Sequence, residues 1–219
     1  MVASTASASD ILWVTYRWMS VGLAITGLVA WFVSQSPAAI ELVLGNRLVF
    51  YGLIIAQLGL VFAFNAVAVR ASTATAAAMF FVYAGVTGLT FSTIFLVYTA
   101  SSIASTFLVS AGAFAGLSAF GALTRRDLSS VGRFAMFALI GLILASVVNL
   151  FLASTALVWI TTFAGVAIFA ALTAYDTQKL LALYAAGEGG NLALRGALTL
   201  YLDFINMFLF LLRLFGRRR

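Results

Sequence analysis

Two aspartates lie in apolar stretches where a carboxylate is costly. Asp203 falls inside the run Leu198–Leu212, which is otherwise almost wholly apolar, and Asp176 lies near the end of the preceding apolar segment. An ionised carboxylate without a partner is strongly disfavoured in hydrocarbon, so a membrane segment keeps one where it has a partner or a task. Each aspartate is the best partner for the other, and we expect the two to form one site.

A close pair of carboxyl groups would act as a proton-sensitive cation site. Both groups cannot stay ionised cheaply at low dielectric, so they share a proton. The site is neutral at low pH; at higher pH it becomes anionic and attracts a metal ion or an arginine. Hard oxygen ligands suit Ca²⁺, but two carboxylates are few, so we expect a weak transit site at Asp176 and Asp203. Asn206, one turn beyond Asp203, is a possible auxiliary ligand or hydrogen-bond partner.

Depth along the helices favours this pairing. Asp176 lies eight residues before Tyr184, the expected end of the sixth helix, and Asp203 lies eight residues after Arg195. At about 1.5 Å per residue, each acid is roughly 12 Å from the connection between the two helices. Antiparallel neighbours would place both acids at one depth, although their faces could still point apart.

Simpler roles remain open for the candidate residues. Asp176 could form an ordinary intrahelical salt bridge with Lys179, one turn on, or lie in water near the membrane surface. Arg70 ends the second apolar segment on the same expected side as Asp176. It is the candidate for a gating latch on the acids, or it simply marks the membrane edge.

Composition places the whole chain in the membrane. Of 219 residues, 64% are hydrophobic and 8% are charged, whereas soluble domains carry about 25% charged residues. We expect an all-α polytopic protein of one domain, residues 1–219, with a short polar N-terminal segment of about residues 1–11. The chain has no histidine, so any pH sensing near neutrality must come from carboxylates or a perturbed amine.

Seven apolar segments are long enough to span a membrane. Their expected bounds are Leu12–Val33, Leu48–Val69, Ala76–Tyr98, Ile103–Leu123, Phe134–Leu152, Leu157–Tyr175 and Ala197–Phe215. The sixth helix is expected to continue past Asp176 to Tyr184. Close helix packing is expected at the small-residue motif Gly112–Gly116 and at Gly85 and Gly88.

Basic residues set the expected orientation. With the N-terminus inside, the cytoplasmic side holds most of them: Arg17, Arg70, Arg125, Arg126, Arg133, Lys179 and Arg195. The positive-inside rule therefore predicts a cytoplasmic N-terminus and, after seven spans, an outside C-terminus. The basic tail Arg217–Arg219 conflicts with this, and a re-entrant last segment would return it to the inside.

Other functions are disfavoured. The net charge of +6 is mostly arginine at segment ends, so no nucleic-acid partner is expected. No histidine-based triad, phosphate loop or dinucleotide fingerprint is present. Tyr175-Asp176 resembles the Tyr-Asp element of intramembrane aspartyl proteases, but their Gly-Leu-Gly-Asp element is missing. We expect no enzyme activity and no cofactor. The other acids, Asp10, Glu41, Asp127 and Glu188, lie near segment ends or in connections, with Asp127 as a solvated partner or a helix cap.

Three stretches resemble the bacterial branch of the Bax inhibitor-1 (TMBIM) family. They are Leu172–Lys179, Leu200–Phe208 and Phe120–Ser130, and the resemblance extends over nearly the whole chain. It implies seven helices with the last one central and wrapped by the others. It also implies a pH-sensitive calcium leak channel with Asp176 and Asp203 as its sensor. The family's latch arginine corresponds more loosely to Arg70.

The sequence and the resemblance together favour a calcium leak channel of the bacterial inner membrane. Its partners would be Ca²⁺, protons and the lipid bilayer, with Ca²⁺ as the transported or bound ion. The alternative is a membrane-embedded regulator that binds a membrane-bound AAA protease or another membrane complex and conducts nothing. Flux through the purified protein in liposomes would separate the two.

Overall fold

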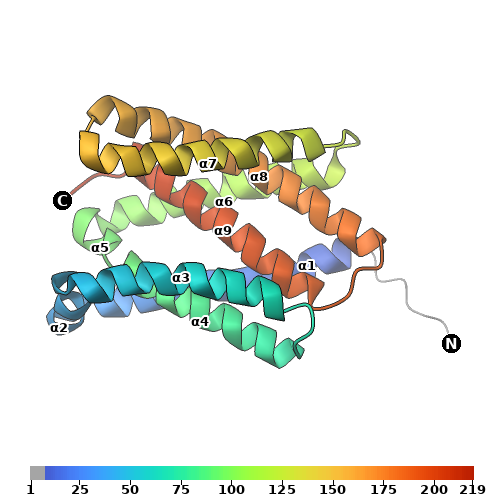
Figure 1. The fold of residues 1–219 in the computed structure, drawn as a ribbon, viewed down its shortest axis with the longest axis horizontal. Helices are drawn as coiled ribbons and strands as arrows, with labels where there is room; N and C mark the ends of the chain where they lie inside the picture. The colour runs from blue at the N-terminus through green and yellow to red at the C-terminus, as the bar shows by residue number, and fades with distance from the viewer. Residues whose placement is uncertain (1–7) are drawn as a thin grey trace. The chain divides into compact units, whose positions relative to one another are not determined.

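The computed structural model describes residues 8–219 as a set of helices (Figure 1). Seven of the helical stretches in this part are long and apolar enough to cross a membrane: Ser9–Ser34, Arg47–Val67, Thr73–Val97, Ala100–Leu123, Ser129–Leu152, Thr155–Ala185 and Leu192–Phe215. The described residues form no β-strand, apart from an isolated antiparallel bridge between Tyr98 and Arg218. The expected all-α membrane architecture is confirmed.

The helices begin and end close to the expected bounds. They are α1 (Ala8–Ser34), α2 (Pro37–Ile40), α3 (Arg47–Val67), α4 (Thr73–Phe91), α5 (Ile94–Val97), α6 (Ala100–Leu123), α7 (Ser129–Leu152), α8 (Thr155–Ala185) and α9 (Leu192–Phe215), with a π-helical turn, η1, at Glu41–Gly45. α1 begins within the segment expected to be polar, residues 1–11, of which residues 1–7 lie outside the described part. The expected continuation of the sixth span past Asp176 is confirmed, because α8 ends at Ala185.

The third expected segment is divided by hydroxyl groups. Ser92 and Thr93 separate α4 from α5, and their side chains donate to the carbonyl oxygens of Leu89 and Thr90 at 2.7 and 2.9 Å. Such bonds compete with the helical ladder for the same acceptors and bend or end a helix. A hydropathy pattern carries no sign of this division, which explains why the sequence predicted one continuous segment.

The chain divides into two compact units. The first holds the described residues up to Thr99 together with residues 183–201 and 218–219, and the second holds residues 100–182 and 202–217. The residues of α9 are shared between them: its first ten belong to the first unit and the rest to the second. The expectation of a single domain stays a prediction.

A buried polar cluster holds the first unit together. The Thr26 hydroxyl lies 2.9 Å from the Ala84 carbonyl oxygen and 2.7 Å from the hydroxyl of Tyr201, which is fully buried. The Tyr201 ring meets the rings of Phe80 and Tyr83 edge to face. A Cβ added at Gly88 would collide with the Thr26 carbonyl, so the close packing expected at this glycine is confirmed.

Aromatic and small residues pack the second unit. Phe204 of α9 lies edge to face against Phe107 and Phe114 of α6. A Cβ added at Gly121 would collide with the Ala174 carbonyl, so α6 approaches the backbone of α8 closely there. The packing expected at Gly112, Gly116 and Gly85 is wrong, because a Cβ at each would meet nothing within 4 Å.

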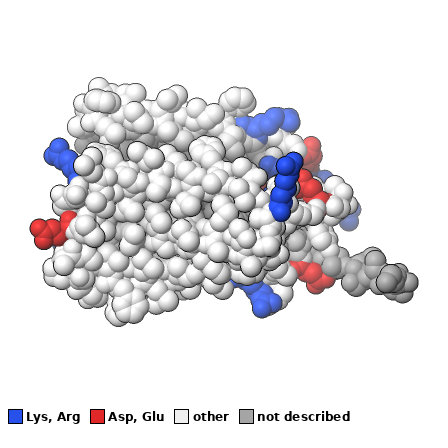
Figure 2. All heavy atoms as spheres, turned by 60° about the horizontal axis from the view of Figure 1, so that its bottom comes forward, with Lys and Arg blue, Asp and Glu red and all other residues white. Residues whose placement is uncertain are grey.

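The last helix is the most enclosed of the seven spans. In α9, 56% of the most apolar stretch is buried, against 33% or less in each of the others. The surface that Figure 2 displays is mostly uncharged, with few lysine, arginine and acidic side chains. Large apolar side chains are exposed on the other spans, as expected where a helix faces lipid.

The C-terminal tail returns to the connection between the third and fourth spans. The backbone N–H of Arg217 donates to the Ser102 hydroxyl at 2.9 Å. Arg218 pairs with Tyr98, and the N–H of Arg219 donates to the Val97 carbonyl at 3.0 Å. The chain therefore ends at the level of this connection, after a continuous helix of 24 residues. This geometry favours a full last span over a re-entrant one.

Candidate functional site: the Asp176–Asp203 carboxyl pair

The structure brings the two aspartates together. The side chains of Asp176, from α8, and Asp203, from α9, face each other within hydrogen-bonding reach in the second unit. Asp203 is 4% exposed, whereas Asp176 is only partly buried. The open question of which way the two helical faces point is thereby answered, and the expected meeting of the two acids is confirmed.

Close approach of three helices positions the pair. The contact of Gly121 with the Ala174 carbonyl brings α6 against α8 two residues before Asp176. Gly165 of α8 similarly faces the Phe210 ring of α9, leaving no room for a Cβ. The aromatic contacts of Phe204, the residue after Asp203, fix the adjacent part of α9 against α6. Both acids are thus carried on rigid, well-packed helices.

A hydrogen bond between two carboxyl groups has a chemical requirement. An ionised carboxylate only accepts hydrogen bonds, so two carboxyl groups can bond to each other only when one carries a proton. Asp203 Oδ2 is buried and has no hydrogen-bond partner in the described part of the chain. A buried acceptor left unsatisfied in this way is uncommon and costs about 1–3 kcal/mol. The structure thus places a buried acceptor oxygen, Asp203 Oδ2, beside a second carboxyl group.

Lys179 does not neutralise Asp176 through a salt bridge. Its charge interacts with that of Asp176, but Lys179 Nζ lies above the Tyr175 ring, 5.8 Å from its centroid. Within residues 8–219, an ion pair instead joins Arg195 Nη1 to Glu188 Oε2, which lie 3.2 Å apart. The alternative of an ordinary Asp176–Lys179 salt bridge is therefore not what the structure contains.

Asn206 is half-buried on α9, and its amide nitrogen donates to the Leu202 carbonyl oxygen at 2.8 Å. It lies three residues beyond Asp203 and so shares its side of the helix. Among residues 8–219, no three Asp, Glu, His or Cys side chains cluster as metal ligands. The donors that the sequence assigned to a calcium ion are thus two carboxyl groups and one amide, and a role for Asn206 as a ligand stays a prediction.

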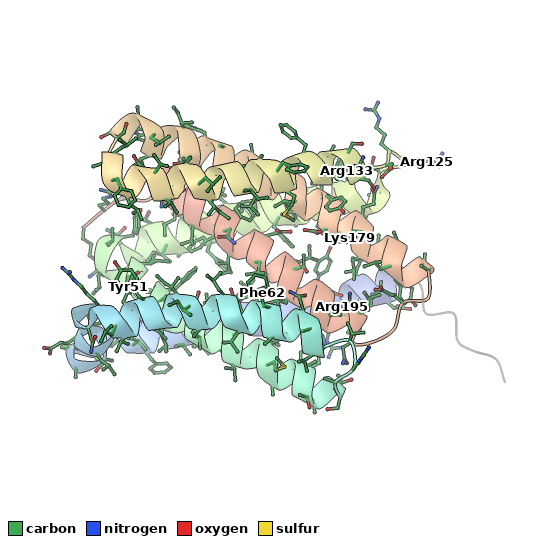
Figure 3. All side chains as sticks on the ribbon, viewed as in Figure 1. Tyr51, Phe62, Arg125, Arg133, Lys179 and Arg195 are labelled. Atoms are coloured by element: carbon green, nitrogen blue, oxygen red, sulfur yellow. The ribbon has the colours of Figure 1, made fainter. Side chains whose placement is uncertain are left out.

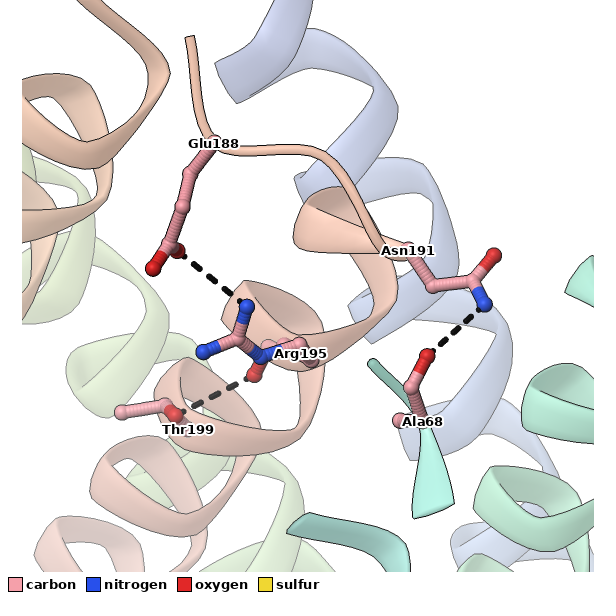
Figure 4. A network of polar contacts seen from close by, with 5 residues as sticks. All are labelled: Ala68, Glu188, Asn191, Arg195 and Thr199. Atoms are coloured by element: carbon pink, nitrogen blue, oxygen red, sulfur yellow. Dashed lines mark hydrogen bonds and ion pairs between the residues drawn. The ribbon is translucent and has the colours of Figure 1, made fainter. Parts of the chain in front are cut away.

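Arg70 lies in the first unit, on a segment tied to the loop before α9. It is exposed and follows the end of α3. The side-chain amide of Asn191 donates to the Ala68 carbonyl oxygen at 2.9 Å (Figure 4). It also donates to the Ala71 carbonyl oxygen at 2.9 Å. Gly190 sits so close to the Val69 carbonyl that a Cβ would collide with it. The Arg70 backbone is thereby held to the segment that leads into α9, and the latch stays a prediction.

Hydroxyl groups beside the acids were missed by the sequence reasoning. Thr177, the residue after Asp176, shares a hydrogen bond of 2.7 Å with Ser118 of α6, and both are buried. Thr177 also donates to the Thr173 carbonyl oxygen at 2.8 Å. Two threonines one turn apart on either side of Asp176 were the available signal. Serine and threonine are common in this chain, so these two threonines did not stand out in the sequence.

The remaining acids have surface roles. Asp10 and Glu41 are exposed, and Glu188 pairs with Arg195. Asp127 Oδ1 accepts from the N–H of Ser129, the first residue of α7, at 2.8 Å. The hydrogen bonds from Ser129, helped by the charge of Arg133, lower the pKa of Asp127. Of the two expected roles, solvated partner or helix cap, the structure favours the second in a modified form: Asp127 accepts from the first N–H of α7 from the position before the N-cap residue, Leu128.

Known proteins match this chain over almost its whole length. Residues 9–219 match the family described as "Inhibitor of apoptosis-promoting Bax1". The chain belongs to the Bax inhibitor-1 family. The resemblance carried by the two aspartate motifs is thus confirmed, and the protein is a membrane protein of this family.

Bacterial relatives support the same assignment. Inner membrane protein YbhL of Escherichia coli is 51% identical over 210 residues, covering 93% of this chain and 90% of its own. An uncharacterized protein of Deinococcus radiodurans is 46% identical over 208 residues, covering 93% and 89%. An uncharacterized membrane protein of Streptococcus pyogenes is 34% identical over 209 residues, covering 92% and 90%.

Proposed function

We propose that this protein is a pH-sensitive calcium leak channel of the bacterial inner membrane, gated by the protonation of Asp176 and Asp203. The observation that carries the proposal is the pair of facing carboxyl groups on α8 and α9, with Asp203 Oδ2 buried and without a hydrogen-bond partner among the described residues. Acids in a membrane interior that bind protons or cations mark ion pathways. The name of the Escherichia coli relative supports the inner membrane as the location.

The gate follows from the chemistry of the pair. With one shared proton, the two carboxyl groups hold α8 and α9 together through their hydrogen bond. Loss of that proton leaves two negative charges side by side, which repel each other and attract a cation. Ca²⁺ accepts carboxylate and amide oxygens together with water, so Asn206 would assist the acids. With few protein ligands the ion binds weakly, as passage requires.

Orientation follows the positive-inside rule, with a cytoplasmic N-terminus and an outside C-terminus. The tail residues Arg217–Arg219 meet the connection between the third and fourth spans, which an N-inside topology places outside. Cysteine labelling from either side of the membrane tests this orientation, since the chain contains no native cysteine.

Flux measurements test the function directly. Purified protein in liposomes should pass Ca²⁺ in the absence of any partner, at a rate that changes between about pH 5 and pH 8, although the chain lacks histidine. Flux that stays constant across this range contradicts the sensor. Folded protein that passes no Ca²⁺ at any pH contradicts the channel and favours the alternative, a regulator of a membrane-bound AAA protease or another membrane complex.

A further inference from the structure

A basic hollow lies where α6, α7 and α8 meet, at the connection between α6 and α7. It has a volume of about 330 Å³ and is lined by three cationic side chains, Arg125, Arg126 and Lys179, with Ser129 and Tyr175 beside them. All of these residues belong to the second unit. Figure 3 labels Arg125 and Lys179, together with Arg133, at this end of the three helices. Arg125, Arg126 and Ser129 have no part in the proposed leak function.

The α6–α7 connection that forms this hollow is held in place by Gln178. The side-chain amide of Gln178 donates to the Arg126 carbonyl oxygen at 2.9 Å, and its oxygen accepts from the N–H of Leu128 at 2.8 Å. Gly132 of α7 lies so close to the Tyr175 ring of α8 that a Cβ would collide with it. Both sides of the hollow are therefore fixed before any ligand arrives.

The charges in the hollow are unbalanced. Its one acid, Asp127, already accepts a hydrogen bond from Ser129 and lies in the field of Arg133. In the described part of the chain, none of the three lining cations forms an ion pair within 4.0 Å. Three positive charges thus face one negative charge that caps a helix, and an anion is the ligand that this arrangement favours.

We propose that this hollow binds the phosphate group of an anionic phospholipid. The guanidinium groups of Arg125 and Arg126 can each donate two parallel hydrogen bonds to phosphate oxygens, and Lys179 adds a point charge. The helices next to the hollow carry exposed apolar side chains, with Leu123 81% and Phe134 75% exposed, so acyl chains have a surface beside it. Basic pockets between spans on the cytoplasmic side commonly receive such headgroups. This site is independent of the proposed leak.

Native mass spectrometry of the full-length protein in detergent tests the site. Phosphatidylglycerol should bind more tightly than phosphatidylcholine. Because a basic residue near an anionic headgroup contributes about 1 kcal/mol, Arg126→Gln should weaken phosphatidylglycerol binding about fivefold. The matched control, Arg17→Gln, removes an exposed arginine from α1 and should leave the affinity unchanged. Gln178→Leu should also weaken binding, although it retains every charge, because it releases the α6–α7 connection.

Three results would overturn the proposal. Equal losses in Arg126→Gln and Arg17→Gln would mean general attraction to a basic surface. Unchanged binding in both Arg126→Gln and Gln178→Leu would place the lipid elsewhere. Full displacement of phosphatidylglycerol by an equal concentration of glycerol 3-phosphate would assign the hollow to a soluble phosphate compound instead of a lipid.

Discussion

Replacing Asp203 with asparagine separates the titration of the carboxyl pair from its packing. In the wild type, one of the two carboxyl groups must be protonated for Asp176 and Asp203 to form a hydrogen bond. Asp203 Oδ2 has no hydrogen-bond partner among the described residues. An amide has nearly the same shape, but it donates its own N–H and cannot ionise. Asp176 is then the only acid of the pair and can stay ionised as the acceptor of the amide N–H, so the two side chains no longer need to share a proton.

The substitution Asp203→Asn sets the expected changes in flux and in the free energy of unfolding. A single titrating group changes its ionised fraction by up to about tenfold per pH unit, so wild-type flux can change by up to about a hundredfold over two units. In Asp203→Asn the same pH step should change flux by less than about twofold. Because the hydrogen bond to Asp176 is retained, the free energy of unfolding should change by no more than about 1 kcal/mol.

Liposomes loaded with a calcium indicator provide the assay, with external pH stepped from about 5 to 8. Asp127→Asn is the matched control, because it removes an exposed acid outside the spans and should retain the full pH response. The melting temperature in detergent confirms that each variant folds. A folded Asp203→Asn protein with the wild-type pH profile would refute the reasoning, and Asp203 would then be a structural polar residue.

Two further predictions concern charges away from the pair. Arg70→Ala should raise the leak at the pH where the wild type is most closed, because the proposed latch is lost. It should also move the midpoint of the pH response upward, because a cation latched onto the acids would favour their ionised form. A double-mutant cycle with Asp176→Asn should give a coupling of about 0.5–3 kcal/mol, and a value near zero would leave Arg70 as a marker of the membrane edge. Asp127→Asn should lower the melting temperature at pH 7 but have little effect well below pH 3.8, the ordinary pKa of this group. The pKa of Asp127 is lowered by folding, so its stabilisation is present above the ordinary value and disappears as pH falls through the folded one; a pH-independent difference would contradict the capping role.

The spans and the pairing of the acids were predictable because each rests on a strong signal along the chain. Long apolar runs defined seven helices, and counting residues from the connection placed Asp176 and Asp203 at one depth. The resemblance of their flanking residues to the Bax inhibitor-1 family pointed to the same two positions. The depth of a residue in the membrane depends only on its position along its own helix, so it can be counted from the sequence.

Contacts that depend on the rotation of a helix were not predictable in the same way. The motif Gly112–Gly116 predicted close packing, but a Cβ at either glycine would meet nothing within 4 Å. Gly121, on the same helix, contacts the α8 backbone. Both have the same chemistry, and only the neighbouring helix decides which one is used. Lys179 was likewise expected to be able to pair with Asp176, but its ammonium group lies over Tyr175.

One helix, α9, carries both the Tyr201 anchor of the first unit and Asp203 of the carboxyl pair. Tyr201 is anchored in the first unit by Thr26 and by the rings of Phe80 and Tyr83, whereas Asp203, two residues later, belongs to the second unit. A continuous helix transmits a rotation or shift at one residue to the next turn, because its backbone hydrogen bonds resist local deformation. Repulsion between Asp176 and Asp203 after loss of their proton therefore acts on the same helix that Tyr201 anchors.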